Sequence, residues 1–233
     1  MKSYEAMMPT DTFFNLPIEK RNLILHLAIE EFANHSYHSA SITNIIRKAG
    51  IAKGSFYQYF ADKKACYRYL VEIATEEKLN IVTEVPAPNP SSDLFRYLRW
   101  QFLAQVHFEL NRPKLAQILY RAFIEDIPFP NMTEELRRRG TTQYFRQLLS
   151  QGILHGTLAP WVDVDVAAFL TEVIFYQFGK YFIECLNLTK EDFINHATYQ
   201  RQDVQALLTS LMDILEAGIK RNPAQQANFL KSN

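Results

Sequence analysis

The chain has 233 residues, of which 48% are apolar, with 25 Lys and Arg balanced by 25 Asp and Glu. This length suits one large domain or a small domain joined to a larger one, and the apolar fraction supports a sizeable core. A net charge of zero argues against a protein that coats polyanions over its whole surface, but it allows a local basic patch.

Two widely spaced cysteines, Cys66 and Cys185, are typical of a reducing cytosol rather than of a disulfide scaffold, and burial in a helical core is the default expectation for both. No basic leader precedes an apolar run at the N-terminus, and charges interrupt each apolar stretch before about 18 residues. We therefore expect no signal peptide, no membrane span and a cytoplasmic location.

The first predicted elements are helices separated by short loops. Residues 1–16 lack a clear period and are expected to be flexible. From Pro17 to Ala33, apolar residues recur on one helical face, and the proline suits the first turn. After a polar loop, Ser41 is placed to cap a second helix, which Gly50 ends through a positive φ.

The third predicted helix is short and is followed by a longer one. It covers residues 52–59 and directs Phe56 and Phe60 inward, and Asp62 caps a fourth helix that runs to about residue 82. Two short helices joined by a tight turn have the layout of a helix-turn-helix, whose second helix enters the DNA major groove. Between residues 41 and 64 the chain carries five cations and one anion, namely Arg47, Lys48, Lys53, Lys63, Lys64 and Asp62.

Three prolines between residues 85 and 92 cannot continue a helix, so we place a domain boundary there. Every long segment beyond it has a helical period. The expected helices run from a cap at Ser91 or Ser92 to about 110, from Pro113 to about 126, from 133 to 151, from a cap at Asp163 or Asp165 to about 186, and from 202 to 220, with a short helix inside 187–201. The sequence predicts an all-α protein of about nine or ten helices.

Four motifs follow one another along the chain: Ser41-Ile42-Thr43, Ala49-Gly50-Ile51, Lys53-Gly54-Ser55-Phe56-Tyr57-Gln58-Tyr59-Phe60 and Asp62-Lys63-Lys64. Their type and order make residues 17–70 resemble the TetR family of transcriptional regulators. Two positions depart from the family pattern. Ala52 replaces a frequent Ser cap, whose loss costs about 0.5–2 kcal/mol, and Ser36 replaces a frequent Gly. Neither change removes a DNA-facing group.

The resemblance implies a ligand-responsive repressor that binds a palindromic operator as a homodimer and is released by a small apolar or aromatic effector. With the boundary at the prolines, we expect a helix-turn-helix domain at 17–62, a connecting helix at 63–82, a regulatory and dimerisation domain at 83–222 and a loose tail at 223–233. No cofactor or metal is expected, and the protein would work at the nucleoid. Activation instead of repression stays open.

On the resemblance and their placement, eight residues are expected to contact DNA: Thr43, Lys53, Gly54, Ser55, Tyr57, Gln58, Tyr59 and Lys63. Gly54 would let the backbone approach the duplex, Lys53 can reach a guanine edge or a phosphate, and Tyr57 can donate to a phosphate. Lys63 would meet a phosphate at the start of the fourth helix. For Tyr59 a core position is an equal alternative, and Arg47 and Lys48 suit a solvated surface.

The C-terminal region is expected to supply the dimer face and the effector site. The proposed dimer residues are Ala167, Ala168, Phe175, Gly179, Leu207, Leu211 and Leu215, with packing inside one chain as the alternative. The proposed effector contacts are Trp100, Gln105, His107, Phe108, Tyr120, Phe123, Tyr144, Phe175, Gln177 and Phe178. For any single aromatic residue in this set, filling the core is the alternative role.

Catalysis is the first rival to this interpretation. The six histidines lack metal-ligand spacing, and neither a Gly-rich phosphate loop nor a GxSxG turn occurs. Asp163 and Asp165 are better explained as helix caps than as a catalytic pair. The second rival is a helical interaction or ligand-sensing module without DNA binding, which an acidic or truncated third helix would indicate; here that helix is intact.

Overall fold

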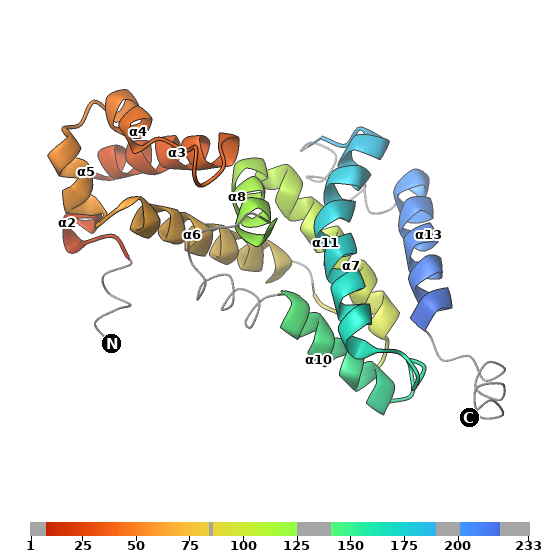
Figure 1. The fold of residues 1–233 in the computed structure, drawn as a ribbon. Coiled ribbons are helices and arrows are strands. Elements are labelled where there is room, and N and C mark those ends of the chain that lie inside the picture. The colour runs from red at the N-terminus through yellow and green to blue at the C-terminus, as the bar shows by residue number, and fades with distance from the viewer. Residues whose placement is uncertain (1–7, 84–85, 125–140, 190–200, 220–233) are drawn as a thin grey trace. The chain divides into compact units, whose positions relative to one another are not determined.

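The computed structural model describes residues 8–83, 86–124, 141–189 and 201–219. These residues form helices and no strand, which confirms the all-α prediction (Figure 1). The chain divides into two compact units, one of Met1–Asn80 with Arg112–Thr133 and the other of Ile81–Asn111 with Glu134–Asn233. Among the described helices, none combines the length and the apolar character that crossing a bilayer requires.

The first unit contains a helix-turn-helix and the helices that support it. Its elements are α2 (Asp11–Phe14), α3 (Ile18–Asn34), α4 (Ile42–Ala49), α5 (Lys53–Tyr59), α6 (Lys63–Thr83) and α8 (Pro113–Ile124). Phe32, Phe56 and Phe60 are fully buried at its centre, together with Tyr67 of α6. These large apolar side chains hold the short helices α4 and α5, which are too short to be stable alone.

The predicted helix boundaries in this unit are confirmed by their capping geometry. Ser41 Oγ accepts a hydrogen bond from the Asn44 N–H at 3.3 Å, and Gly50 ends α4 with φ of 64°. Asp62 Oδ1 accepts from the Ala65 N–H at 2.7 Å at the start of α6. Ala52 has no side-chain oxygen to cap α5, as its sequence position indicated.

The expectation that residues 1–16 are flexible is corrected for their described part. Residues Asp11–Phe14 form α2, and the ring of Phe13 is completely buried, 4.9 Å from the Phe60 ring centroid. A four-residue helix shows no periodicity, so the sequence pattern gave no sign of it. Residues 1–7 lie outside the described part of the chain.

The domain boundary also differs from the expected one, because α8 packs with the first unit. Lys114 of α8 forms an ion pair with Glu30 of α3, and Arg121 Nε donates to the Ala33 carbonyl at 3.3 Å. Arg112 pairs with Glu77 of α6 at 2.7 Å. Helix α8 therefore belongs with the helix-turn-helix and not with the region that surrounds it in sequence.

The second unit contains α7 (Leu94–Asn111), α10 (Thr141–Leu154), α11 (Val164–Leu186) and α13 (Gln202–Ile219). Asp93, not Ser91 or Ser92, caps α7, since its Oδ1 accepts from the Arg96 N–H at 2.9 Å. Asp163 caps α11. The start predicted at 133, most of the short helix predicted within 187–201 and the tail 223–233 lie outside the described residues.

An aromatic cluster fills the core of the second unit. The ring centroid of Phe175 on α11 lies 5.7 Å from that of Phe102 on α7 and 5.5 Å from that of Phe145 on α10. Phe178 and Phe182 extend the cluster along α11. Edge-on and tilted ring contacts of this kind add to the stability that burial alone supplies. This core fixes the faces that α7 and α11 direct outward.

Candidate nucleic-acid interface

Helix α5 presents most of the residues expected to contact DNA on its exposed side. Lys53, Gly54 and Gln58 are exposed, and Tyr57 is 46% exposed, whereas Ser55 is half-buried. Phe56, on the opposite side, is completely buried. Thr43 is exposed on the neighbouring helix α4. Six of the eight residues thus remain accessible on the two helices of the helix-turn-helix.

Gly54 lies in a part of α5 where nothing in the fold requires a glycine. A Cβ built on Gly54 would meet no atom within 4 Å. Glycine inside a helix lowers stability by about 0.5–1 kcal/mol relative to alanine. A residue that weakens the helix without serving its packing is suited to the close approach of another molecule.

Tyr59 is a core residue in this structure. It is 5% exposed, and its ring centroid lies 6.1 Å from that of Phe13. Of the two alternatives left by the sequence, the core position is the one the structure supports, and we remove Tyr59 from the expected DNA contacts.

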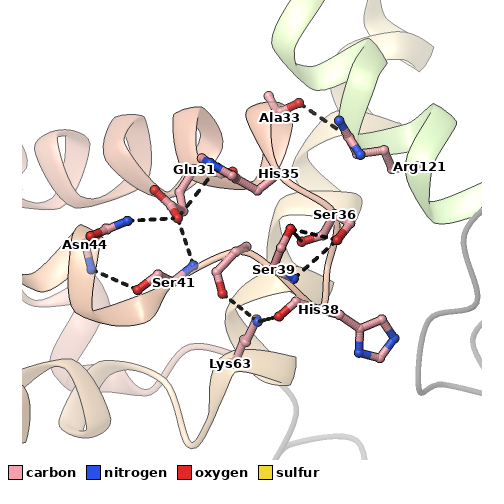
Figure 2. Close-up of polar contacts among 11 residues, drawn as sticks. Glu31, Ala33, His35, Ser36, His38, Ser39, Ser41, Asn44, Lys63 and Arg121 are labelled. Atoms are coloured by element: carbon pink, nitrogen blue, oxygen red, sulfur yellow. Dashed lines mark hydrogen bonds and ion pairs between the residues drawn. The ribbon is translucent and has the colours of Figure 1, made fainter.

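The ammonium group of Lys63, which is also expected to contact DNA, bonds to the protein itself. Nζ donates to the carbonyl oxygens of Ala40 at 2.6 Å and His38 at 3.1 Å, as Figure 2 shows, and it lies 5.0 Å from the centroid of the Tyr37 ring. Burial lowers the pKa of Lys63, while the negative charge of Glu31 opposes that shift. In this structure the Lys63 ammonium group has an intramolecular role.

Glu31 of α3 holds the loop between α3 and α4, which contains His38 and Ala40. Its buried carboxylate accepts the Ser41 N–H at 2.8 Å and the Asn44 Nδ2 amide at 3.5 Å (Figure 2). Sequence analysis missed Glu31, although a signal exists: this carboxylate shares the inward face of the helix with Ala28 and Phe32. A buried charge in such a position needs partners, and here they are the cap of α4, Asn44 in its first turn, and His35 Nδ1 at 3.6 Å.

Thr10 supports the C-terminal end of α5. Its N–H donates to the Tyr59 carbonyl at 2.9 Å, and its hydroxyl donates to the Gln58 carbonyl at 2.6 Å. The last carbonyls of a helix have no partner within the helix, so an outside donor satisfies them. The segment expected to be flexible thus fixes the C-terminal end of the exposed helix.

The expected effector residues are distributed over both units. Tyr120 and Phe123 lie on α8 in the first unit, and the remainder lie in the second. Phe108, Phe175 and Phe178 are buried, whereas Trp100, His107 and Tyr144 are half-buried. Gln177 is exposed on α11, so it does not contribute to the interior.

A row of polar residues runs along α7 at intervals of four: Tyr97, Gln101, Gln105 and Glu109. Gln101 Nε2 donates to the hydroxyls of Tyr97 at 2.9 Å and Tyr144 at 3.0 Å, and these two hydroxyls bond to each other. Burial, followed by the Tyr97 hydrogen bond, raises the pKa of Tyr144. Gln105 Nε2 donates to Glu109 at 2.6 Å.

Gln105 is the member of this row with unused bonding capacity. It is 5% exposed, and within the described residues its Oε1 has no hydrogen-bond partner. An unsatisfied buried acceptor costs about 1–3 kcal/mol. The row therefore contains a buried carbonyl acceptor without a partner among the described residues.

The expected dimer face is corrected, because most of its residues form the core of one chain. Ala167, Ala168, Phe175, Gly179 and Leu215 are buried, and Leu207 and Leu211 pack partly buried against the same core. The outward face of α11 carries other apolar side chains at helical spacing: Val166, Phe169, Leu170 and Val173. On α13, Ile214 is a large apolar residue that is 70% exposed.

An exposed helix with a basic first residue, supported by a frame of short helices, defines a helix-turn-helix DNA-binding protein. The model of bacterial regulatory proteins of the tetR family matches residues 24–70, and the model of the tetracyclin repressor-like C-terminal domain matches residues 92–220. The chain belongs to the TetR family and is a DNA-binding transcriptional regulator.

Solved structures and curated relatives agree with this assignment. A TetR family transcriptional regulator from Chloroflexus aurantiacus J-10-FL is 41% identical, with a TM-score of 0.79 over 92% of this chain and 100% of that one. The fatty acid metabolism regulator protein of Bacillus subtilis is 23% identical over 84% of this chain and 93% of its own length. The HTH-type transcriptional regulator YdgC of the same organism is 37% identical over 54 residues. The chain spans about a quarter of the length of YdgC and two similar curated relatives.

Proposed function

We propose that this regulator is a homodimeric repressor that binds a palindromic operator and is released by a small apolar or aromatic effector. The observation that carries the proposal is the exposed side of α5, where Lys53, Gly54 and Tyr57 face away from a core that includes Phe56. A regulator of this kind acts on the chromosome, so we expect it in the cytoplasm at the nucleoid.

Each exposed group suits one part of a duplex. Lys53, at the first position of α5, reaches a guanine edge or a phosphate, and Gln58 reads adenine or bonds to the backbone. Thr43 and Ser55 donate to phosphates or bases. Tyr57 donates its phenol hydroxyl to a phosphate while its ring lies along the sugar. Gly54 lets these contacts form at short range.

The dimer forms, in this proposal, through the outward apolar face of α11 together with α13. A contiguous stripe of exposed apolar side chains at Val166, Phe169, Leu170 and Val173 is uncommon on a monomer surface and marks an interaction site. The occupant is a second copy of the chain, because a two-fold operator needs two reading helices at a fixed separation.

The effector contacts the polar row of α7. Gln105 Oε1 accepts a hydrogen bond from a donor on the effector, and the surrounding aromatic residues of the second unit bind its apolar part. The similarity to a fatty acid metabolism regulator over 84% of the chain is consistent with an apolar ligand.

We call α5 the reading helix. Release from DNA follows if the effector binds more tightly to the dimer conformation in which the two reading helices are wrongly spaced for the operator than to the conformation that fits it. Helix α6 connects effector binding to DNA binding along the chain. It begins directly after the helix-turn-helix and ends at Thr83, a residue of the second unit. A shift of α6 would change the separation of the two α5 helices in the dimer.

Selection of a duplex from random-sequence DNA tests this function, followed by affinity measurements by fluorescence anisotropy. We expect a palindromic site, and we expect Lys53→Ala or Tyr57→Ala to lose about 1–3 kcal/mol of binding free energy. Arg96→Ala, which removes one exposed charge in the second unit, is the matched control and leaves affinity unchanged. If no duplex is enriched, the ligand-sensing module without DNA binding becomes the better interpretation.

A further inference from the structure

The loop between α3 and α4, residues 35–41, is held by two charged side chains from different helices. Lys63, the first residue of α6, donates to the carbonyl oxygens of His38 and Ala40, and Glu31 of α3 accepts the N–H of Ser41 (Figure 2). Lys63 and Glu31 bind the two ends of one peptide group, the Ala40 carbonyl and the Ser41 N–H, so together they fix both the path of the loop and the starting point of α4.

The ammonium group of Lys63 has three N–H donors. Two of them bond to the carbonyl oxygens, at 3.1 and 2.6 Å, and the group also faces the ring of Tyr37. Tyr37 is itself fixed by ring contacts with Phe32 of α3 and Tyr67 of α6, at 6.4 and 5.1 Å. Turning Lys63 toward a phosphate would cost these two hydrogen bonds, one to the exposed carbonyl of His38 and one to the part-buried carbonyl of Ala40.

The geometry that Lys63 maintains extends to the reading helix. The Ser41 N–H bonds to Glu31 while Ser41 Oγ caps α4, so the position of the loop sets the position of α4. Helix α4 packs on α5 through the turn at Gly50. A change at Lys63 is therefore transmitted to α5 without any contact between Lys63 and DNA.

We propose that Lys63 is a positioning residue for operator binding: it links the start of α6 to the loop before α4 and does not contact a phosphate. Lys63 thus joins the helix that leads to the second unit to the element that orients the reading helix. The proposal rests on the DNA-binding role stated above.

The test compares Lys63→Met, Lys63→Arg and Lys53→Met, using a duplex selected with the wild-type chain. Affinity is measured as a function of salt concentration at a temperature where circular dichroism shows every variant folded. For Lys63→Met we expect affinity to fall by about tenfold, with the slope of log affinity against log salt unchanged. Lys63→Arg, which keeps donors for the two carbonyl groups, restores most of the affinity.

The salt slope separates positioning from phosphate contact. Each phosphate contact contributes about 0.9 to the slope of log affinity against log salt. Loss of one contact in each subunit would therefore change the slope of the dimer by about 1.8. Lys53→Met is the control that shows such a change for an exposed cation on α5. A slope change of that size for Lys63→Met, or unchanged affinity, overturns the proposal.

A second variant covers the case in which Lys63→Met does not fold. Glu31→Gln weakens the other attachment of the loop, keeps the side-chain shape and removes no cation, so it should also lower affinity at a constant salt slope. Full affinity in folded Glu31→Gln would count against positioning through this loop. A wild-type chain that enriches no duplex would instead overturn the DNA-binding role itself, which separates the two failures.

Discussion

The carboxylate of Glu109 on α7 occupies the space that a side chain at Gly179 on α11 would need. A Cβ built on Gly179 would lie 2.5 Å from Glu109 Oε1, the same oxygen that accepts a hydrogen bond from Gln105. The small size of residue 179 therefore serves the packing of two helices within one chain.

Gly179→Ala should destabilise the protein by about 1 kcal/mol, because moving Glu109 breaks a charge-assisted hydrogen bond that outweighs the gain from alanine in a helix. In a Glu109→Ala background the same substitution should stabilise by about 0.5–1 kcal/mol. Denaturant unfolding of the four proteins measures this coupling. Equal effects of Gly179→Ala in both backgrounds would contradict the contact.

Gly54→Ala should separate stability from DNA binding. The new methyl group meets no atom of the protein, so the variant should gain about 0.5–1 kcal/mol of stability. On a bound duplex the same methyl group would occupy space needed for close approach, and affinity should fall. Thermal melting and anisotropy on the same preparation check both effects; a variant that gains stability and keeps full affinity would exclude close contact at residue 54.

Phe169→Glu should convert the dimer to a monomer, because it places a charge in the centre of the apolar stripe on α11, where Phe169 is 59% exposed. Leu154→Glu is the matched control, since Leu154 is also apolar and exposed but lies on α10. Sedimentation velocity at micromolar concentration distinguishes them. Loss of the dimer in both variants, or in neither, would place the interface elsewhere.

Gln105→Met should change the stability of the free protein by less than about 1 kcal/mol, because removal of the unsatisfied carbonyl offsets loss of the Nε2–H bond to Glu109, and it should remove the response to the effector. Methionine has a similar volume and eliminates the buried carbonyl that is unsatisfied among the described residues. The measurement combines the melting temperature without ligand with a thermal-shift screen of hydrophobic compounds. A compound that stabilises wild type and Gln105→Met equally would show that Gln105 takes no part in binding.

The thiol of Cys66 should resist modification in the folded protein. Cys66 is completely buried on α6, and burial strongly raises its pKa, so the reactive thiolate is scarce at neutral pH. In a Cys185→Ser variant, a thiol reagent should label Cys66 only after denaturant is added. Rapid labelling under native conditions would indicate frequent opening of the first unit.

Sequence alone predicted the helix-turn-helix well, because local chemistry determines its boundaries. Ser41, Gly50 and Asp62 are caps whose function depends on residues within one turn, and the structure confirms all three. Tyr59 and Lys63 were placed on the DNA side by resemblance, but their side chains are engaged by Phe13 and by the carbonyls of the loop before α4, which are distant in sequence.

The dimer face was the least predictable feature, since α11 is apolar on two sides. Small residues such as Ala168 and Gly179 suit close approach between copies, yet they serve equally well against a helix of the same chain. Phe169 and Leu170, which remain exposed, differ from the buried Phe175 only by their rotation around the helix. Periodicity identifies such faces but does not state which neighbour covers each one.

The two hydrogen bonds from Thr10 have a practical consequence for experiments on this protein. Thr10 satisfies the last carbonyl groups of α5 from outside the helix-turn-helix. A shortened variant that lacks Thr10 would leave those carbonyl groups to water, so operator affinities measured with it would understate those of the longer chain.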